Sequence, residues 1–115
     1  MNTIRKCVDE LLDAGKDDFV YLGEVVRIVE SAYGTNSAEL RARTLDVIKA
    51  VLSDGLMELG DLKREGFFKW ELPEAECMRR VDREWQAMEK DPSLPFIVWL
   101  RNTPKGDESA ERVSM

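Results

Sequence analysis

The spacing of apolar residues changes at Gly55 in this 115-residue chain, and this change restricts the possible folds more than any other feature of the sequence. Before Gly55, apolar residues recur every three or four positions in three successive segments, the spacing that places them on one face of a helix. After it come short apolar and aromatic segments separated by polar residues and glycine, a pattern typical of strands. The sequence therefore predicts three amphipathic helices followed by a portion that mixes strands and helix.

Glycine follows each of the three predicted helices. The helices are predicted at residues 3–14, 22–33 and 36–52, and they are followed by Gly15, Gly34 and Gly55. Gly15 in particular suits the left-handed backbone position that often comes after a last helical turn. Between the first two helices, Phe19-Val20-Tyr21 favours a short strand because aromatic and β-branched residues are enriched in strands.

The portion beyond Gly55 predicts a β-hairpin, a fourth helix and a final strand. The predicted parts are a strand at 56–59, a polar loop at 60–66, a strand at 67–72, a helix that opens at Pro73 and ends near Asp91-Pro92, and a strand at 96–100 that adds to the hairpin. Residues 103–115 hold Pro104, Gly106 and five charged residues but only two aliphatic ones, a composition that predicts a disordered tail.

This order of elements predicts an α+β fold. It is winged-helix-like, with a three-helix bundle and a β-hairpin, plus a C-terminal helix and strand that extend the sheet. We expect a single winged-helix-like domain at residues 1–102 and a disordered C-terminal tail at residues 103–115. No run approaches the roughly 18 apolar residues of a membrane span, and no signal peptide is apparent, so the expected location is cytoplasmic.

Composition restricts the possible chemistry. The formal net charge is -6, and the chain has no histidine, which removes the commonest general base and the zinc sites that depend on histidine. Cys7 and Cys77 fall on predicted apolar stripes and are expected to be buried free thiols. No phosphate-binding loop, metal motif or nucleophile motif occurs. We therefore expect no enzymatic activity, no cofactor and no metal.

A winged helix suggests DNA binding through the third helix, but the charge pattern argues against it. The predicted solvent face of that helix alternates in sign, with Glu39, Arg43, Asp46 and Lys49. A surface that binds duplex DNA should be mostly basic, because phosphate neutralisation supplies much of the affinity. Lys63 and Arg64 in the hairpin loop could touch a DNA backbone. A winged-helix DNA-binding transcriptional regulator therefore remains the alternative function.

The three tryptophans are expected mainly in the core. Trp85 is in phase with Met78 and Val81 on the fourth helix, which predicts a buried indole. Trp70 and Trp99 lie in predicted strands and are also expected to be buried, although an indole left at the rim of the protein would suit a partner-binding role.

Much of the chain resembles a family of small bacterial proteins, some of which are associated with polymorphic-toxin or contact-dependent growth-inhibition loci. The resemblance covers roughly residues 20–100 and is carried by LGEVV (22–26), LSDGLMELGDL (52–62), GFFKW (66–70), PE (73–74), REW (83–85), DP (91–92) and IVW (97–99). Leu72 departs from the pattern, since the family tends to have a polar cap before the Pro-Glu pair.

The resemblance implies a cytoplasmic immunity protein that binds and neutralises a cognate bacterial toxin. The acidic charge predicts a toxin with a basic active-site surface, most naturally a nuclease-type toxin domain; neither a membrane nor nucleic acid is an expected partner. Charge alone selects the candidate partner-binding residues, which are Asp54, Glu58 and Asp61 at the helix–hairpin junction and Asp17 and Asp18 as a second patch.

Overall fold

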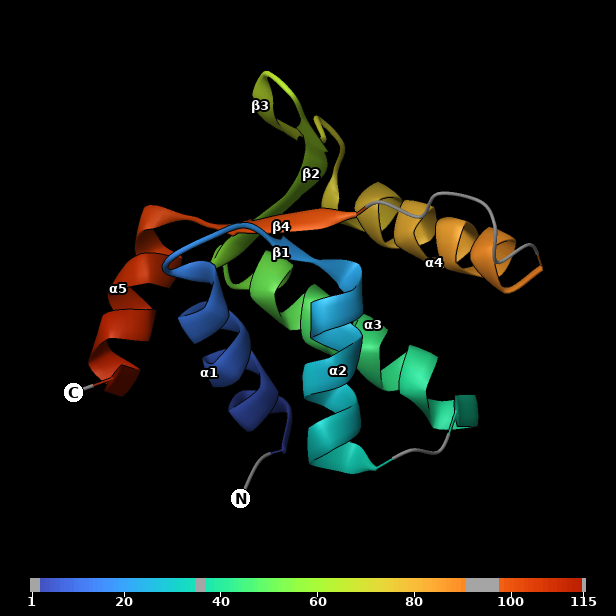
Figure 1. The fold of residues 1–115 in the computed structure, drawn as a ribbon, viewed down its shortest axis with the longest axis horizontal. Helices are drawn as coiled ribbons and strands as arrows, with labels where there is room; N and C mark the ends of the chain where they lie inside the picture. Colours follow the sequence, from blue (N-terminus) through green and yellow to red (C-terminus); the bar gives the residue numbers. More distant parts are fainter. Residues whose placement is uncertain (1–2, 35–36, 91–97, 115) are drawn as a thin grey trace.

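Three helices form a bundle against one face of a four-stranded antiparallel sheet, from which a hairpin projects (Figure 1). The computed structural model describes residues 3–34, 37–90 and 98–114. Its elements are α1 (Thr3–Gly15), β1 (Val20–Tyr21), α2 (Leu22–Tyr33), α3 (Ser37–Ser53), β2 (Met57–Lys63), β3 (Gly66–Lys69), α4 (Glu74–Lys90), β4 (Trp99–Asn102) and α5 (Pro104–Ser114). The predicted α+β, winged-helix-like architecture, with a helix and a strand beyond the hairpin, is confirmed.

The last strand joins the two parts of the sheet. The strand order is β1-β4-β2-β3, so β4 lies between the hairpin and the short strand that precedes α2. Trp99 of β4 pairs with Tyr21 on one side and with Gly60 on the other. The strand begins later than predicted, at Trp99, and residues 96 and 97 of the prediction lie outside the described residues, as does Asn36 at the predicted start of the third helix.

The core lies between the bundle and the inner face of the sheet. Its fully buried residues include Leu11, Leu12, Val25, Val29, Val47, Ile48, Val51, Leu59 and Leu100. Cys7 and Cys77 are buried free thiols, as predicted. Burial raises the pKa of both thiols, because the thiolate form loses hydration in the core. Both sulfurs are therefore protonated and unreactive at neutral pH.

The first strand of the hairpin is longer, and the turn tighter, than the sequence predicted, whereas the second strand ends at Lys69 and not at residue 72. Strand β2 continues through residues 60–63, which were expected to form a loop, and only Arg64 and Glu65 separate the two strands. Gly66, with φ of 133°, supplies the backbone conformation that the turn requires. The polar residues suit a strand here because this part of the hairpin extends beyond the bundle into solvent (Figure 1).

The predicted disordered tail is wrong for residues 104–114, which form helix α5. Thr103 caps this helix, because its hydroxyl accepts the backbone N–H of Gly106 at 3.1 Å while its own proton is directed to the carbonyl oxygen of Gly55 at 2.6 Å. Ala110 is fully buried. Gly106 lies so close to the backbone carbonyl of Leu56 that no Cβ would fit there.

A buried amide joins α5 to the rest of the molecule. The side-chain nitrogen of Asn102 donates to the carbonyl of Leu12 at 3.0 Å and to the carboxylate of Asp107 at 3.1 Å. Gly15 leaves the space that this amide occupies, since a Cβ on Gly15 would collide with it. Gly15 is thus required by close packing and does not adopt the left-handed backbone that the sequence suggested, which among the described glycines is found at residues 34, 55 and 66.

Candidate functional site

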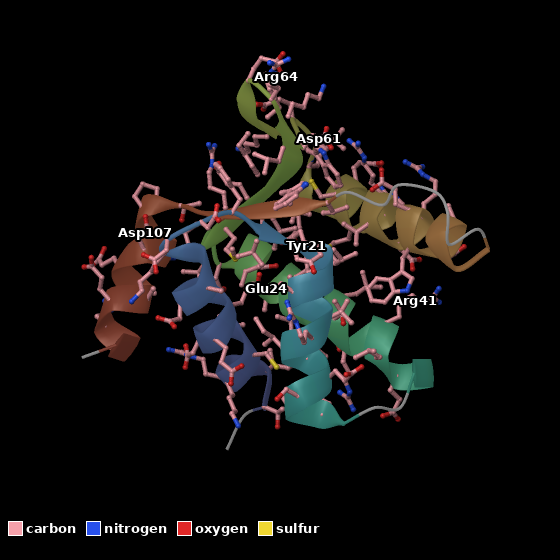
Figure 2. The ribbon with its side chains drawn as sticks, in the orientation of Figure 1. Tyr21, Glu24, Arg41, Asp61, Arg64 and Asp107 are labelled. Carbon is pink, nitrogen blue, oxygen red and sulfur yellow. The ribbon has the colours of Figure 1, made fainter. Side chains whose placement is uncertain are left out.

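The acidic residues predicted at the helix–hairpin junction do not form one surface. Glu58 and Asp61 are three positions apart on β2, so their side chains project from opposite faces of the sheet. Asp61 lies towards α4, with a carboxylate oxygen 3.7 Å from a guanidinium nitrogen of Arg80 (Figure 2). Asp54 is exposed in the turn after α3, where its backbone carbonyl accepts a hydrogen bond from the Lys105 ammonium at 2.9 Å.

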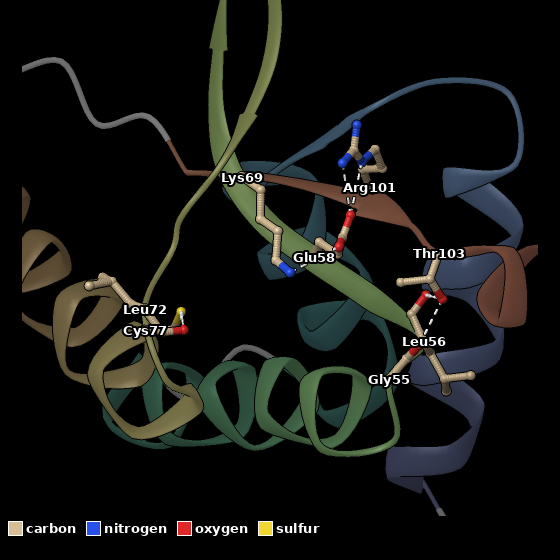
Figure 3. A network of polar contacts seen from close by, with 8 residues as sticks. All are labelled: Gly55, Leu56, Glu58, Lys69, Leu72, Cys77, Arg101 and Thr103. Carbon is tan, nitrogen blue, oxygen red and sulfur yellow. Dashed lines mark hydrogen bonds and ion pairs between the residues drawn. The ribbon is translucent and has the colours of Figure 1, made fainter.

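Glu58 is neutralised by two cations on the neighbouring strands (Figure 3). One carboxylate oxygen accepts hydrogen bonds from Nε and Nη2 of Arg101 at 3.1 and 2.8 Å, and the other lies 3.3 Å from the Lys69 ammonium. Partial burial raises the pKa of Glu58, but the hydrogen bonds from Arg101 and Lys69 outweigh it and bring the pKa below its ordinary value. This carboxylate therefore ties β3 and β4 to β2 and is not an open acceptor for a partner.

Glu58 belongs to a larger surface on the outer face of the sheet. Residues directly opposite each other in antiparallel strands project from the same face, so Tyr21, Trp99 and Lys69 share this face with Glu58 and Arg101. The rings of Phe19 and Phe67 extend this surface. We call this surface the aromatic face; it comprises Phe19, Tyr21, Glu58, Phe67, Lys69, Trp99 and Arg101.

The rings of the aromatic face form two pairs. Phe19 and Phe67 are stacked, with centroids 5.4 Å apart and planes 8° apart, and the guanidinium carbon of Arg101 lies 4.4 Å from the centroid of Phe67. Tyr21 and Trp99 have centroids 5.8 Å apart and planes tilted by 46°. Tyr21 retains 45% of its surface exposed. Trp99 is half-buried, so the prediction that it belongs to the core is wrong, whereas Trp70 and Trp85 are buried as predicted.

Alternation along the strands explains why these residues share one face. Val20, Met57, Leu59 and Leu100 project inwards and are buried against the bundle, which leaves their neighbours on the outer side. Two glycines leave room for the rings, because a Cβ on Gly60 would collide with the ring of Phe67 and a Cβ on Gly23 would collide with the ring of Tyr21.

The second predicted acidic patch lies beside this surface. Asp17 and Asp18 are exposed in the turn immediately before Phe19, and a carboxylate oxygen of Asp18 accepts the backbone N–H of Phe19 at 2.7 Å. Sequence reasoning selected these two acids by their charge alone and missed the rings that lie beside them. The available signal was a spacing of two, seen in Phe19 and Tyr21, in Phe67 and Lys69 and in Trp99 and Arg101.

Helix α3 is the one that a winged-helix protein would place in the DNA groove. Its arginines contact other residues of the same chain. Arg41 lies 3.7 Å from a carboxylate oxygen of Asp82 on α4, and Arg43 lies over the ring of Tyr33 at 5.0 Å. Figure 2 shows Arg41 between α3 and α4. The exposed positions of α3 mix charges of both signs, as in Asp46 and Lys49. This surface offers little net positive charge to a phosphate backbone.

The described residues contain no cluster of three histidine, cysteine or acidic side chains placed to hold a metal ion. Among the described helices, none combines the length and apolar character needed to cross a membrane. Comparison with known proteins gives no relatives: no family model matches this chain, and no curated protein or solved structure is similar to it.

Proposed function

We propose that this chain is a cytoplasmic immunity protein that binds and neutralises a cognate bacterial toxin of nuclease type, without catalysing a reaction itself. The observation that carries the proposal is the aromatic face, where an exposed tyrosine and a half-buried tryptophan lie beside an arginine. Tyrosine, tryptophan and arginine are the residue types that dominate the energetics of protein–protein interfaces. A surface of this composition suits a protein partner.

The charge of the chain supports a basic partner. The formal net charge is -6, and Asp17 and Asp18 lie exposed at the border of the aromatic face. A toxin that acts on nucleic acid needs a basic cleft to hold phosphates, so an acidic protein is attracted to that cleft and can block it. The resemblance of residues 20–100 to a family of small bacterial proteins, some of them associated with growth-inhibition loci, supports a toxin as the partner, while the charge supports its nuclease type.

The proposed contact surface differs from the one that charge alone suggested. Glu58 is occupied by Arg101 and Lys69, and Asp61 faces Arg80, so neither carboxylate is open to a partner. Asp17 and Asp18 keep their proposed role as acidic neighbours of the aromatic face. Asp54 lies in the turn between α3 and β2, next to Lys105, and has no part in the proposed contact.

The proposal predicts a toxin reading frame directly upstream of the gene, and it is tested by co-expressing the chain with the product of that reading frame. We expect restored growth and a one-to-one complex that co-purifies. The double variant Tyr21→Ala/Trp99→Ala should lose both, while Phe68→Ala, which removes an equally exposed ring from the hairpin, should keep both.

Two outcomes would contradict the immunity proposal. Binding of duplex DNA that weakens with salt and is lost in a Lys63→Ala/Arg64→Ala variant would replace the immunity proposal with the transcriptional regulator. A toxin that stays active in the presence of excess wild-type protein would also refute the proposal.

A further inference from the structure

Aromatic rings in this protein are repeatedly covered by cations of the same chain. Four such pairs occur among the described residues: Arg43 on Tyr33 at 5.0 Å, Lys63 on Phe68 at 5.4 Å, Arg80 on Trp70 at 3.8 Å and Arg101 on Phe67 at 4.4 Å. A cation within about 6 Å of a ring centroid is attracted by the electron-rich ring face. Within the part of the chain that the structure describes, Tyr21 and Trp99 have only each other as ring partners and carry no cation.

The ring faces of Tyr21 and Trp99 are not fully covered. Because the two planes are tilted by 46°, neither ring fully covers the face of the other. Tyr21 lies on β1, at the edge of the sheet, and is 45% exposed. Its ring packs against Gly23 in the first turn of α2, where a Cβ would collide with it, so the ring position is set by the backbone of the helix.

Three acidic residues lie close to Tyr21 in the sequence. Asp17 and Asp18 come just before β1, and Glu24 follows in the first turn of α2 (Figure 2). In the described portion of the structure, none of the three is seen in an ion pair, although many other charged residues are. A cation at the Tyr21–Trp99 pair would be attracted by the ring faces, and the three acidic residues within four positions of Tyr21 in the sequence add a negative charge that favours it.

We infer that Tyr21 and Trp99 receive an arginine or lysine side chain of the partner protein. The inference rests on the proposed function, because it names the chemical group of the toxin that this face recognises. The partner would supply the cation that Arg101 supplies to Phe67 on the same face. Single-stranded nucleic acid also stacks on aromatic surfaces, but Asp17, Asp18 and Glu24 would repel its phosphates.

The inference can be tested without the toxin. The probe is an acetylated and amidated tri-arginine peptide, added to the full-length ¹⁵N-labelled protein while the indole N–H signals are followed by NMR. A tri-citrulline peptide of nearly the same shape lacks the charge and serves as the matched ligand. Trp99 is assigned from a Trp99→Phe variant, and the buried indoles of Trp70 and Trp85 report any change in the fold.

We expect the tri-arginine peptide to shift the Trp99 signal in a saturable manner, and the citrulline peptide to leave it in place. Tyr21→Leu should weaken the peptide affinity about 3- to 30-fold, the range that a cation–ring contact spans from exposed to desolvated sites. Gly23→Ala, which displaces the Tyr21 ring without removing it, should weaken the affinity in the same direction. Phe68→Leu, which changes an exposed ring on the hairpin, should leave it unchanged.

Three results would overturn the inference: an unmoved Trp99 signal, equal shifts with both peptides, or a Tyr21→Leu variant that binds like wild type. A larger shift with an oligothymidine of eight nucleotides than with the peptide would assign the pair to single-stranded nucleic acid. If the peptide test fails while the toxin complex still forms, only this inference is lost. If the toxin complex does not form, the proposed function is lost, whatever the peptide does.

Discussion

Two aromatic pairs lie on the same face of one sheet, yet their surroundings differ. Phe19 and Phe67 are stacked nearly parallel and are covered by Arg101, whose guanidinium is also held by Glu58. Tyr21 and Trp99 are tilted and have no such cover in the described structure. The first pair has its electrostatic partner within the chain, while the second does not. This difference indicates that the first pair holds the hairpin in place and that the second is available to a partner.

The largest expected effect comes from crowding the first pair. Gly60→Ala would force a Cβ into the ring of Phe67 and against the backbone carbonyl of Phe68, which cannot move without bending the hairpin. We expect a loss of about 3 kcal/mol in the free energy of unfolding, at the upper end of overpacking effects. Urea denaturation measures it.

Gly23→Ala is the matched control for this prediction. The added Cβ there meets only the exposed side chain of Tyr21, so the free energy of unfolding should change by less than about 0.5 kcal/mol. Equal effects of the two variants would remove the distinction between a structural pair and an available pair.

The second expected effect concerns affinity and not stability. Tyr21→Leu removes an exposed ring, so the unfolding free energy should change by less than about 0.5 kcal/mol, while the affinity for the toxin should fall about tenfold. Calorimetric titration of the purified complex checks the affinity, and thermal denaturation checks the stability. An unchanged affinity would show that the Tyr21–Trp99 pair lies outside the interface.

The third effect is a dependence of stability on pH. The pKa of Glu58 is lowered in the folded protein, so the ionised form stabilises the fold above the ordinary pKa of a glutamate, and the stabilisation is lost as the pH falls through the lowered value. Glu58→Gln should therefore cost about 1 kcal/mol at pH 7, allowing for the partial exposure of Arg101.

The difference between wild type and Glu58→Gln should stay constant from pH 7 to about 5 and shrink below about pH 4. Urea denaturation at a series of pH values measures this difference. If it grows as the pH falls, Arg101 is not held by an ionised Glu58.

The smallest effect is expected at the exposed ring of the hairpin. Phe68 is 47% exposed, and Lys63 of the same chain lies over its ring. It therefore has a cation of its own, as the Phe19–Phe67 pair does, but it is as exposed as Tyr21. Phe68→Leu should change stability by less than about 0.5 kcal/mol and affinity for the toxin by less than about twofold. A large loss of affinity would show that exposure alone, and not the missing cation, marks the binding surface.

Helices α1 to α4 could be predicted from the sequence because their signals are local. The apolar stripes and the glycines after α2 and α3 lie within a few residues of the turns they determine, and Gly34 and Gly55 do adopt positive φ angles of 96° and 68°. Residues 60–63 were mistaken for a loop because they are polar and hold a glycine. Gly60 is required by the ring of Phe67, a contact that composition does not reveal.

Helix α5 was missed although its start signal is present. Thr103 followed by Pro104 has the residue types of a helix cap and a first helical position, but the charged composition favoured disorder. What orders the helix is contact with distant parts of the chain, such as the carbonyls of Gly55 and Leu56.

The candidate site could be predicted only in part, because some of its contacts join positions that are far apart in the chain. The neutralisation of Glu58 depends on Arg101, 43 positions away, and therefore on a strand pairing that no local pattern specifies. Asp17 and Asp18 could be recognised as exposed acids in a turn from their immediate neighbours, but their position beside Phe19 and its partner ring could not.

The cap at Thr103 has a practical consequence for anyone who trims this protein. A shortened version that stops at residue 102 would remove Ala110 from its buried position, open one side of α1 to water and leave the carbonyls of Gly55 and Leu56 without the Thr103 hydroxyl. A purification tag fused after residue 115 would instead extend from a helix anchored to the domain, on the side of the molecule where α1 and α5 lie together (Figure 1).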